Sequence, residues 1–112
     1  MSDRWHITKE AGTVTLSRHL PARFDVAAHT HLPPARPERL AHQIRQDLWR
    51  ALSKVRGFSP VVQLEPMERG WAVTAGGRVM GRISPAVVAT IEALLNDPAK
   101  RTRWVSHAKV RP

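Results

Sequence analysis

The chain has 112 residues, which is the length of a single domain. It has no cysteine and no tyrosine, which excludes disulfides, thiolate metal sites and cysteine or tyrosine nucleophiles. Lys and Arg number 18 against 9 Asp and Glu, and the net charge of +9 favours an anionic partner. No stretch approaches the roughly 18 consecutive apolar residues of a membrane-spanning helix. Residues 1–6 lack the features of a targeting segment, so we expect a cytoplasmic location.

The N-terminal third predicts a hairpin followed by a long loop. Apolar and polar residues alternate over 5–8 and 14–17, on either side of a turn-like spacer that contains Gly12, and this pattern predicts a β-hairpin. The residues that would share its buried face are Trp5, Ile7, Val14 and Leu16. Residues 18–36 hold three prolines and three of the six histidines, so we expect an irregular connection there.

The clearest element is a helix over residues 37–55. Pro37 suits the first helical position, and Gly57 lies where a left-handed residue commonly ends a helix. The apolar stripe at helical spacing consists of Leu40, Ile44, Leu48, Ala51, Leu52 and Val55. Trp49 falls at the border between this stripe and the polar side.

Three strands are predicted next, over 58–65, 71–75 and 78–83, with Gly76 and Gly77 as a two-residue hairpin turn. Ser84 followed by Pro85 predicts the start of a helix, and Asp97 predicts the cap of another. The last segment, residues 98–112, contains five Lys or Arg and no acidic residue.

These elements predict a single α+β domain over residues 1–112. We expect an N-terminal β-hairpin, a long helix, a three-stranded antiparallel meander, and one or two C-terminal helices packed on the sheet. A helix, three strands and a helix also follow one another in double-stranded-RNA-binding domains. The likeness ends with that order, because residues 84–89 carry no cation at the start of the second helix. No motif in the chain identifies a family.

The candidate site consists of cations that could hold phosphate groups. They lie on the long helix, on the outer side of the predicted sheet and in the basic C-terminal segment. The candidates are Arg36, Arg39, Arg45, Arg50, Lys54, Arg78, Arg82, Lys100, Arg101 and Arg103. The alternative is that these side chains are a solvated surface, but such surfaces usually mix both signs of charge.

Tryptophan and histidine offer further candidates. Trp5 and Trp71 occupy core positions of the predicted strands, whereas Trp104 either stacks on a base or anchors the terminal helix, and we favour the anchor. His29 and His31 have the spacing of metal ligands on a strand, but they fall in the predicted loop. We therefore expect no metal and no cofactor.

The sequence predicts a non-enzymatic binding module for nucleic acid or another polyanion, which recognises charge or shape rather than base sequence. The alternative is a protein-interaction or adaptor domain that uses residues 32–35 or the outer sheet face with Val61 and Met80. A small enzyme is a third possibility, tested by His29→Ala and His31→Ala.

Overall fold

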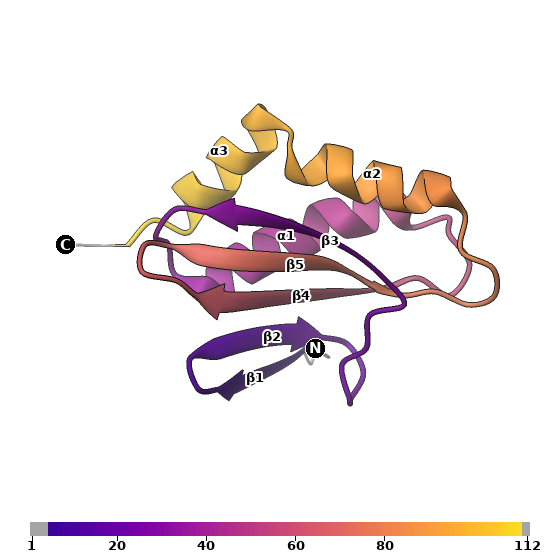
Figure 1. Cartoon of the computed structure of the whole chain (residues 1–112), viewed down its shortest axis with the longest axis horizontal. Coiled ribbons are helices and arrows are strands. Elements are labelled where there is room, and N and C mark those ends of the chain that lie inside the picture. Colours follow the sequence, from indigo (N-terminus) through magenta and orange to yellow (C-terminus); the bar gives the residue numbers. More distant parts are fainter. Residues whose placement is uncertain (1–4, 111–112) are drawn as a thin grey trace.

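The computed structural model describes residues 5–110, and this range forms one antiparallel sheet with three helices (Figure 1). The strands are β1 (His6–Glu10), β2 (Thr13–Ser17), β3 (Val26–Leu32), β4 (Ser59–Pro66) and β5 (Trp71–Arg78). The helices are α1 (Pro37–Leu52), α2 (Pro85–Leu95) and α3 (Pro98–His107). The strands lie in the order β1-β2-β4-β5-β3, and every neighbouring pair is antiparallel.

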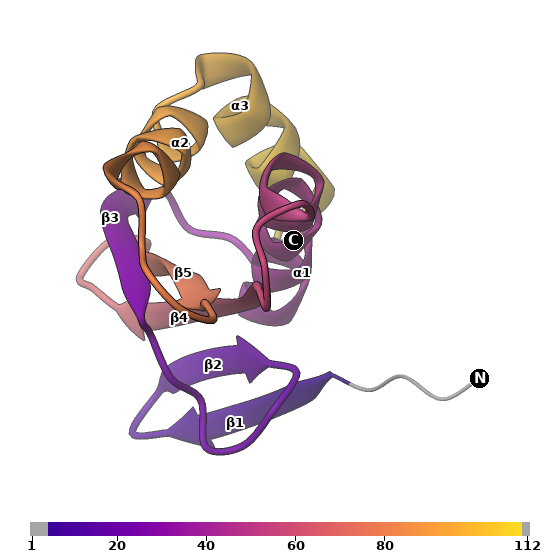
Figure 2. The same ribbon diagram turned by 90° about the vertical axis from the view of Figure 1, so that its right-hand side faces the viewer.

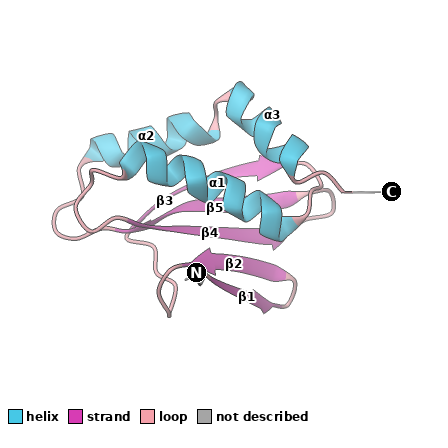
Figure 3. Cartoon of the chain, turned by 180° about the vertical axis from the view of Figure 1, so that it is seen from behind, coloured by secondary structure: helices cyan, strands magenta, loops and turns pink. Residues whose placement is uncertain are grey.

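The three helices cover one face of the sheet (Figures 1 and 2). α1 packs on β4 and β2, α2 packs on β3, and α3 contacts both helices (Figure 3). Because side chains alternate along a strand, every second residue faces this helical layer. The largest fully buried side chains between the two layers are Trp104, Leu16, Leu32, Leu40, Ile44, Leu48, Leu64, Ile91 and Leu95.

Several predicted elements are confirmed. The hairpin forms as expected, with Ile7 paired to Leu16. α1 begins at Pro37, although it ends at Leu52 rather than at residue 55. Ser84 caps α2 by accepting a hydrogen bond from the Ala86 N–H at 3.1 Å, and Asp97 caps α3 in the same manner. The α+β class is therefore correct.

The predicted three-stranded meander is wrong, because the sheet has five strands and a different order. Residues 26–32, predicted as loop, form β3 and pair along their whole length with β5. Gly76 and Gly77 are not a turn but lie inside β5. Residues 79–83 leave the sheet, because the Asp25 carboxylate accepts the Val79 N–H at 2.9 Å and Gly81 has a φ of 80°.

Within residues 5–110, no helix combines the length and the apolar character needed to cross a membrane. Several of the connecting loops gather at one end of the sheet (Figure 1). β2 and β5 end there, whereas β1, β3 and β4 begin there. The β2–β3 connection, the α1–β4 connection and the β5–α2 connection therefore lie close to the start of the hairpin.

Candidate functional site

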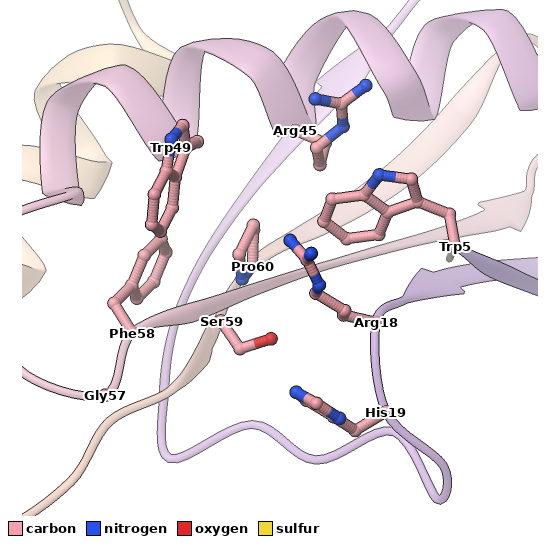
Figure 4. Close-up of a pocket in the computed structure, with 9 residues that line it drawn as sticks. All are labelled: Trp5, Arg18, His19, Arg45, Trp49, Gly57, Phe58, Ser59 and Pro60. Carbon is pink, nitrogen blue, oxygen red and sulfur yellow. The ribbon is translucent and has the colours of Figure 1, made fainter. Parts of the chain in front are cut away.

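A hollow of about 470 Å³ lies at this end of the sheet, beneath the C-terminal half of α1 (Figure 4). We call it the aromatic hollow. Its lining residues are Trp5, Arg18, His19, Arg45, Trp49, Gly57, Phe58, Ser59 and Pro60. They come from the start of the hairpin, the end of β2, the outer side of α1 and the start of β4. The site is thus built by four segments that are distant in sequence.

Trp5 holds two guanidinium groups close together. The Cζ atom of Arg45 lies 4.8 Å from the centroid of the Trp5 ring, and that of Arg18 lies 5.5 Å from it. The β1–β2 register pairs His6 with Ser17, so one further step places Trp5 opposite Arg18. Both distances are within the range in which a cation is attracted to the face of an aromatic ring. The indole therefore fixes two positive charges at the hollow.

Further contacts on α1 position these groups. Arg45 Nη2 lies 3.1 Å from His42 Nδ1, one turn earlier on the helix. The His42 ring meets Trp5 edge to face, with centroids 6.4 Å apart and an angle of 89° between the planes. This is a favoured geometry for aromatic pairs. Arg45 is thus oriented both by its own helix and by the N-terminal strand.

Trp49 and Phe58 form the opposite wall. In Figure 4 their rings lie on one side of the hollow and the Trp5 ring lies on the other, with Arg18 between them. Phe58 is buried, whereas 46% of Trp49 is exposed. A large exposed aromatic ring next to cations is a surface on which a flat ligand can stack. Among the described residues, no carboxylate lines this hollow.

The predicted phosphate-binding cations are divided between this end of the sheet and other surfaces. Arg45 lines the aromatic hollow. Arg78 lines a second hollow, which lies between the β2–β3, α1–β4 and β5–α2 connections. Arg82 lies exposed in the β5–α2 connection, and Lys54 lies exposed just after α1. Arg39 is exposed near the start of α1, beside His107 of α3.

Other predicted cations are engaged within the fold. Arg103 forms an ion pair with Asp47, which also lies 3.7 Å from Arg50. Arg101 donates to Thr30 Oγ1 at 2.6 Å, to the Leu95 carbonyl at 2.8 Å and to the His31 carbonyl at 2.7 Å. Arg101 and Arg103 therefore fasten α3 to β3 and α1.

The remaining predicted cations have mixed surroundings. Lys100 pairs with Asp97 at 3.4 Å. The main chain of Arg36 donates to the Ala108 carbonyl at 2.7 Å, and the Arg36 side chain is partly buried at the start of α1. Arg111, another cation of the basic C-terminal segment, lies outside the described residues. The role of all these cations in phosphate binding stays a prediction.

The tryptophan predictions have different outcomes. Trp104 is fully buried and donates from Nε1 to Asp47 at 2.6 Å, so the predicted anchor of the terminal helix is confirmed. Trp71 is partly buried and donates from Nε1 to the Ala35 carbonyl at 2.9 Å. Trp5 packs against the core as expected, but it also lines the aromatic hollow.

The histidine pair lies on a strand rather than in a loop. His29 and His31 are exposed on the helix-free face of β3, where His29 Nδ1 lies 3.1 Å from Thr74 Oγ1 and His31 Nε2 lies 2.8 Å from the Arg69 carbonyl. Within the described range, no three His, Cys, Asp or Glu side chains are grouped so as to hold a metal ion.

The sequence pattern does not identify Arg18 and His19 as candidate site residues, and it places Trp5 only in the core. The register of the hairpin carries a usable signal, since it puts residue 18 opposite Trp5. The contribution of Trp49 depends on how α1 crosses β4, which no local pattern encodes.

A comparison of the chain with known protein families, curated proteins and solved structures finds no match.

Proposed function

We propose that this chain is a non-enzymatic module that binds nucleic acid through the aromatic hollow. The placement of the exposed Trp49 ring beside the guanidinium groups of Arg18 and Arg45 is the observation that supports this function most. Each nucleotide carries a flat ring and a phosphate, which are the groups that aromatic and arginine side chains bind. A polyanion without flat rings would make no stacking contact with Trp49.

Binding of this kind depends on charge and on stacking. Every base has a flat face, so stacking on Trp49 tolerates all four bases. Arginine contacts to phosphate carry no sequence information. We therefore expect weak sequence preference together with a steep dependence on salt. Stacking and ion pairing make and break no covalent bond, so the proposed function is binding without catalysis.

The test is the affinity for a fluorescent oligothymidylate, measured by anisotropy between about 50 and 200 mM salt. In the variant Arg18→Gln/Arg45→Gln, two phosphate contacts are lost. Because each contact to a single strand contributes about 0.7 to the slope of log K against log salt, the slope should become shallower by about 1.4. We expect the affinity at low salt to fall at least tenfold.

The matched control is Arg69→Gln/Lys109→Gln, which removes the same charge from two exposed positions outside the aromatic hollow. This control should retain most of the wild-type affinity. Equal losses in both double variants would mean that net charge, and not the hollow, determines binding. A binding curve that is the same at low and high salt would exclude the proposed function.

A second candidate is the adaptor function, which one groove favours. The groove lies between the proline-rich β3–α1 connection and α3, has a volume of about 640 Å³, and is lined in part by Pro33, Pro34 and Val105. The outer sheet face is a poorer candidate surface, because Val61 is only 1% exposed there. If the chain is an adaptor, the Val105→Glu variant should no longer bind its protein partner, whereas the Arg18→Gln/Arg45→Gln variant should still bind it.

A further inference from the structure

A second hollow continues the aromatic hollow around the end of the sheet. It has a volume of about 400 Å³, and we call it the loop hollow. Three residues, His19, Gly57 and Ser59, line both hollows. Arg78 and Met80 belong to the loop hollow alone. The shared lining makes the two hollows adjoining parts of one surface depression.

The sheet register places a cation of the loop hollow next to the shared wall. Ser59, the first residue of β4, pairs with Arg78, the last residue of β5. Side chains of directly opposite residues on neighbouring strands lie about 5 Å apart at Cβ. The arginines along the depression are therefore Arg45 and Arg18 in the aromatic hollow, followed by Arg78 and Arg23 in the loop hollow.

Gly57 brings two connections together at the junction between the hollows. Gly57 lies there with a φ of 70°, and a Cβ at this position would come within 2.5 Å of Met80 Cβ. The glycine thus lets the α1–β4 connection approach the β5–α2 connection closely. Met80 itself is 61% exposed and offers an apolar surface beside Arg78.

Arg78 is the cation of the loop hollow best placed to meet a ligand. Arg23, which also lines this hollow, is held by Asp25 through two hydrogen bonds of 2.9 Å. That carboxylate also accepts the Val79 N–H at 2.9 Å, so it faces the main chain and Arg23. Arg78 makes no direct side-chain ion pair with any described residue, although its charge contributes to the lowered pKa of Asp25.

From these observations we infer that the two hollows form one track, which takes at least two consecutive nucleotides of a single strand. One base stacks on Trp49 between the cations of the aromatic hollow, and the next phosphate reaches Arg78. A single strand fits better than a duplex, because paired bases present only their edges and their faces are already covered. This inference rests on the proposed function and adds the class and minimum length of the ligand.

The test measures the affinities of thymidine monophosphate and of oligothymidylates of two, four and eight nucleotides. We expect affinity to rise at least tenfold from the mononucleotide to the tetranucleotide. In Arg78→Gln the tetranucleotide affinity should fall at least fivefold while mononucleotide affinity is unchanged. Arg45→Gln should weaken both ligands. Arg78→Lys, which keeps the charge, should recover most of the tetranucleotide affinity, and this recovery separates a contact from a folding defect.

The matched control is Arg69→Gln, which removes an exposed cation that lines neither hollow. If Arg78→Gln and Arg69→Gln behave alike, or if affinity does not depend on length, the track is overturned while the aromatic hollow remains a binding site. A duplex of eight base pairs that binds as tightly as the octanucleotide also overturns it. If none of the ligands binds, the proposed function itself fails.

Discussion

Trp49 is a large apolar side chain that contributes little to the core. It lies on the outer side of α1 and is 46% exposed, whereas Trp104 on α3 is fully buried. Burial of apolar surface is the main reason for a tryptophan in a fold of this size. The exposure of Trp49 beside two guanidinium groups instead matches a surface that takes a flat ligand.

We predict that Trp49→Ala lowers the affinity for an oligothymidylate by about tenfold, since stacking on one aromatic ring contributes roughly 1–3 kcal/mol per base. Because about half of the Trp49 surface is covered, the variant should also lose some stability, so its affinity is measured at a temperature at which it remains folded. Met67→Ala is the control, since Met67 is 52% exposed at the opposite end of β4. A similar loss of affinity in both variants would contradict a stacking role.

Gly76 shows why the glycine pair is not a turn. A Cβ at this position would lie 2.0 Å from the Val26 carbonyl oxygen of the adjacent strand. Glycine is required at position 76 because β3 approaches β5 closely there, and not because the backbone has a positive φ. A Gly-Gly pair can form a hairpin turn or can allow two strands to approach closely. The sequence alone favours the hairpin turn, which is the commoner of the two.

We expect Gly76→Ala to destabilise the fold by about 3 kcal/mol, because the strands must separate to admit the methyl group. Gly81→Ala is the control, since a methyl group added there would meet no atom within 4 Å and only the φ of 80° opposes the substitution. That strain costs about 1 kcal/mol. Urea denaturation of both variants checks the difference, and equal losses would contradict the close approach.

The elements that were predictable have local signals of their own. Ser84 and Asp97 cap helices with side chains that bind the main chain of the first turn, and the hairpin alternates clearly between apolar and polar residues. β3 has no such signal, because residues 26–32 contain small residues and two histidines next to prolines. It becomes a strand by pairing with β5, and the paired residues are 39 to 51 positions apart in the sequence.

The site was predictable only in part, for the same reason. Arg45 and Arg78 stand out as cations in the sequence, but their relation depends on the β4–β5 register and on the position of α1. Other equally basic residues, such as Arg101 and Arg103, proved to fasten α3. Charge identifies candidates, whereas tertiary contacts decide which of them face a ligand.

The docking of α3 depends on a buried carboxylate of α1. Asp47 is 4% exposed and accepts hydrogen bonds from Trp104 Nε1 and from Arg103. We predict that Asp47→Ala destabilises the fold by about 3 kcal/mol, since it leaves a buried indole N–H without an acceptor and removes an ion pair.

The Asp47→Asn variant separates these two contributions. Asparagine retains an oxygen that can accept from Trp104 but loses the charge that pairs with Arg103. Its stability in urea denaturation should lie between those of the wild type and Asp47→Ala. If Asp47→Asn and Asp47→Ala were equally unstable, the loss would come from the ion pair alone.

For the molecule as a whole, the charge of +9 makes the few carboxylates important for stability. Hydrogen bonds from Arg23 and from the Val79 N–H hold the pKa of Asp25 below its ordinary value. A contact with Lys9 lowers the pKa of Glu38, and the first turn of α3, chiefly the Lys100 N–H, lowers that of Asp97. Each carboxylate therefore favours the folded state only while it is ionised.

Asp25 joins the β2–β3 connection to the end of β5. The direction in which pH changes its contribution to stability follows from its lowered pKa. Because its pKa is lower in the folded chain, its contribution is present above the unfolded value of about 3.9 and disappears as pH falls through the folded value. We predict that Asp25→Asn melts at a lower temperature than the wild type at pH 7. The difference should shrink steadily below about pH 4 as the wild-type carboxylate is protonated.

Thermal melts of both proteins from neutral to strongly acidic pH measure this difference. Glu68→Gln serves as the control, because Glu68 is exposed in the β4–β5 turn and forms no ion pair with any described residue. Its melting temperature should follow that of the wild type at every pH. A deficit in Asp25→Asn that stays constant down to the most acidic condition would show that the shape of the side chain, and not its charge, holds the connection in place.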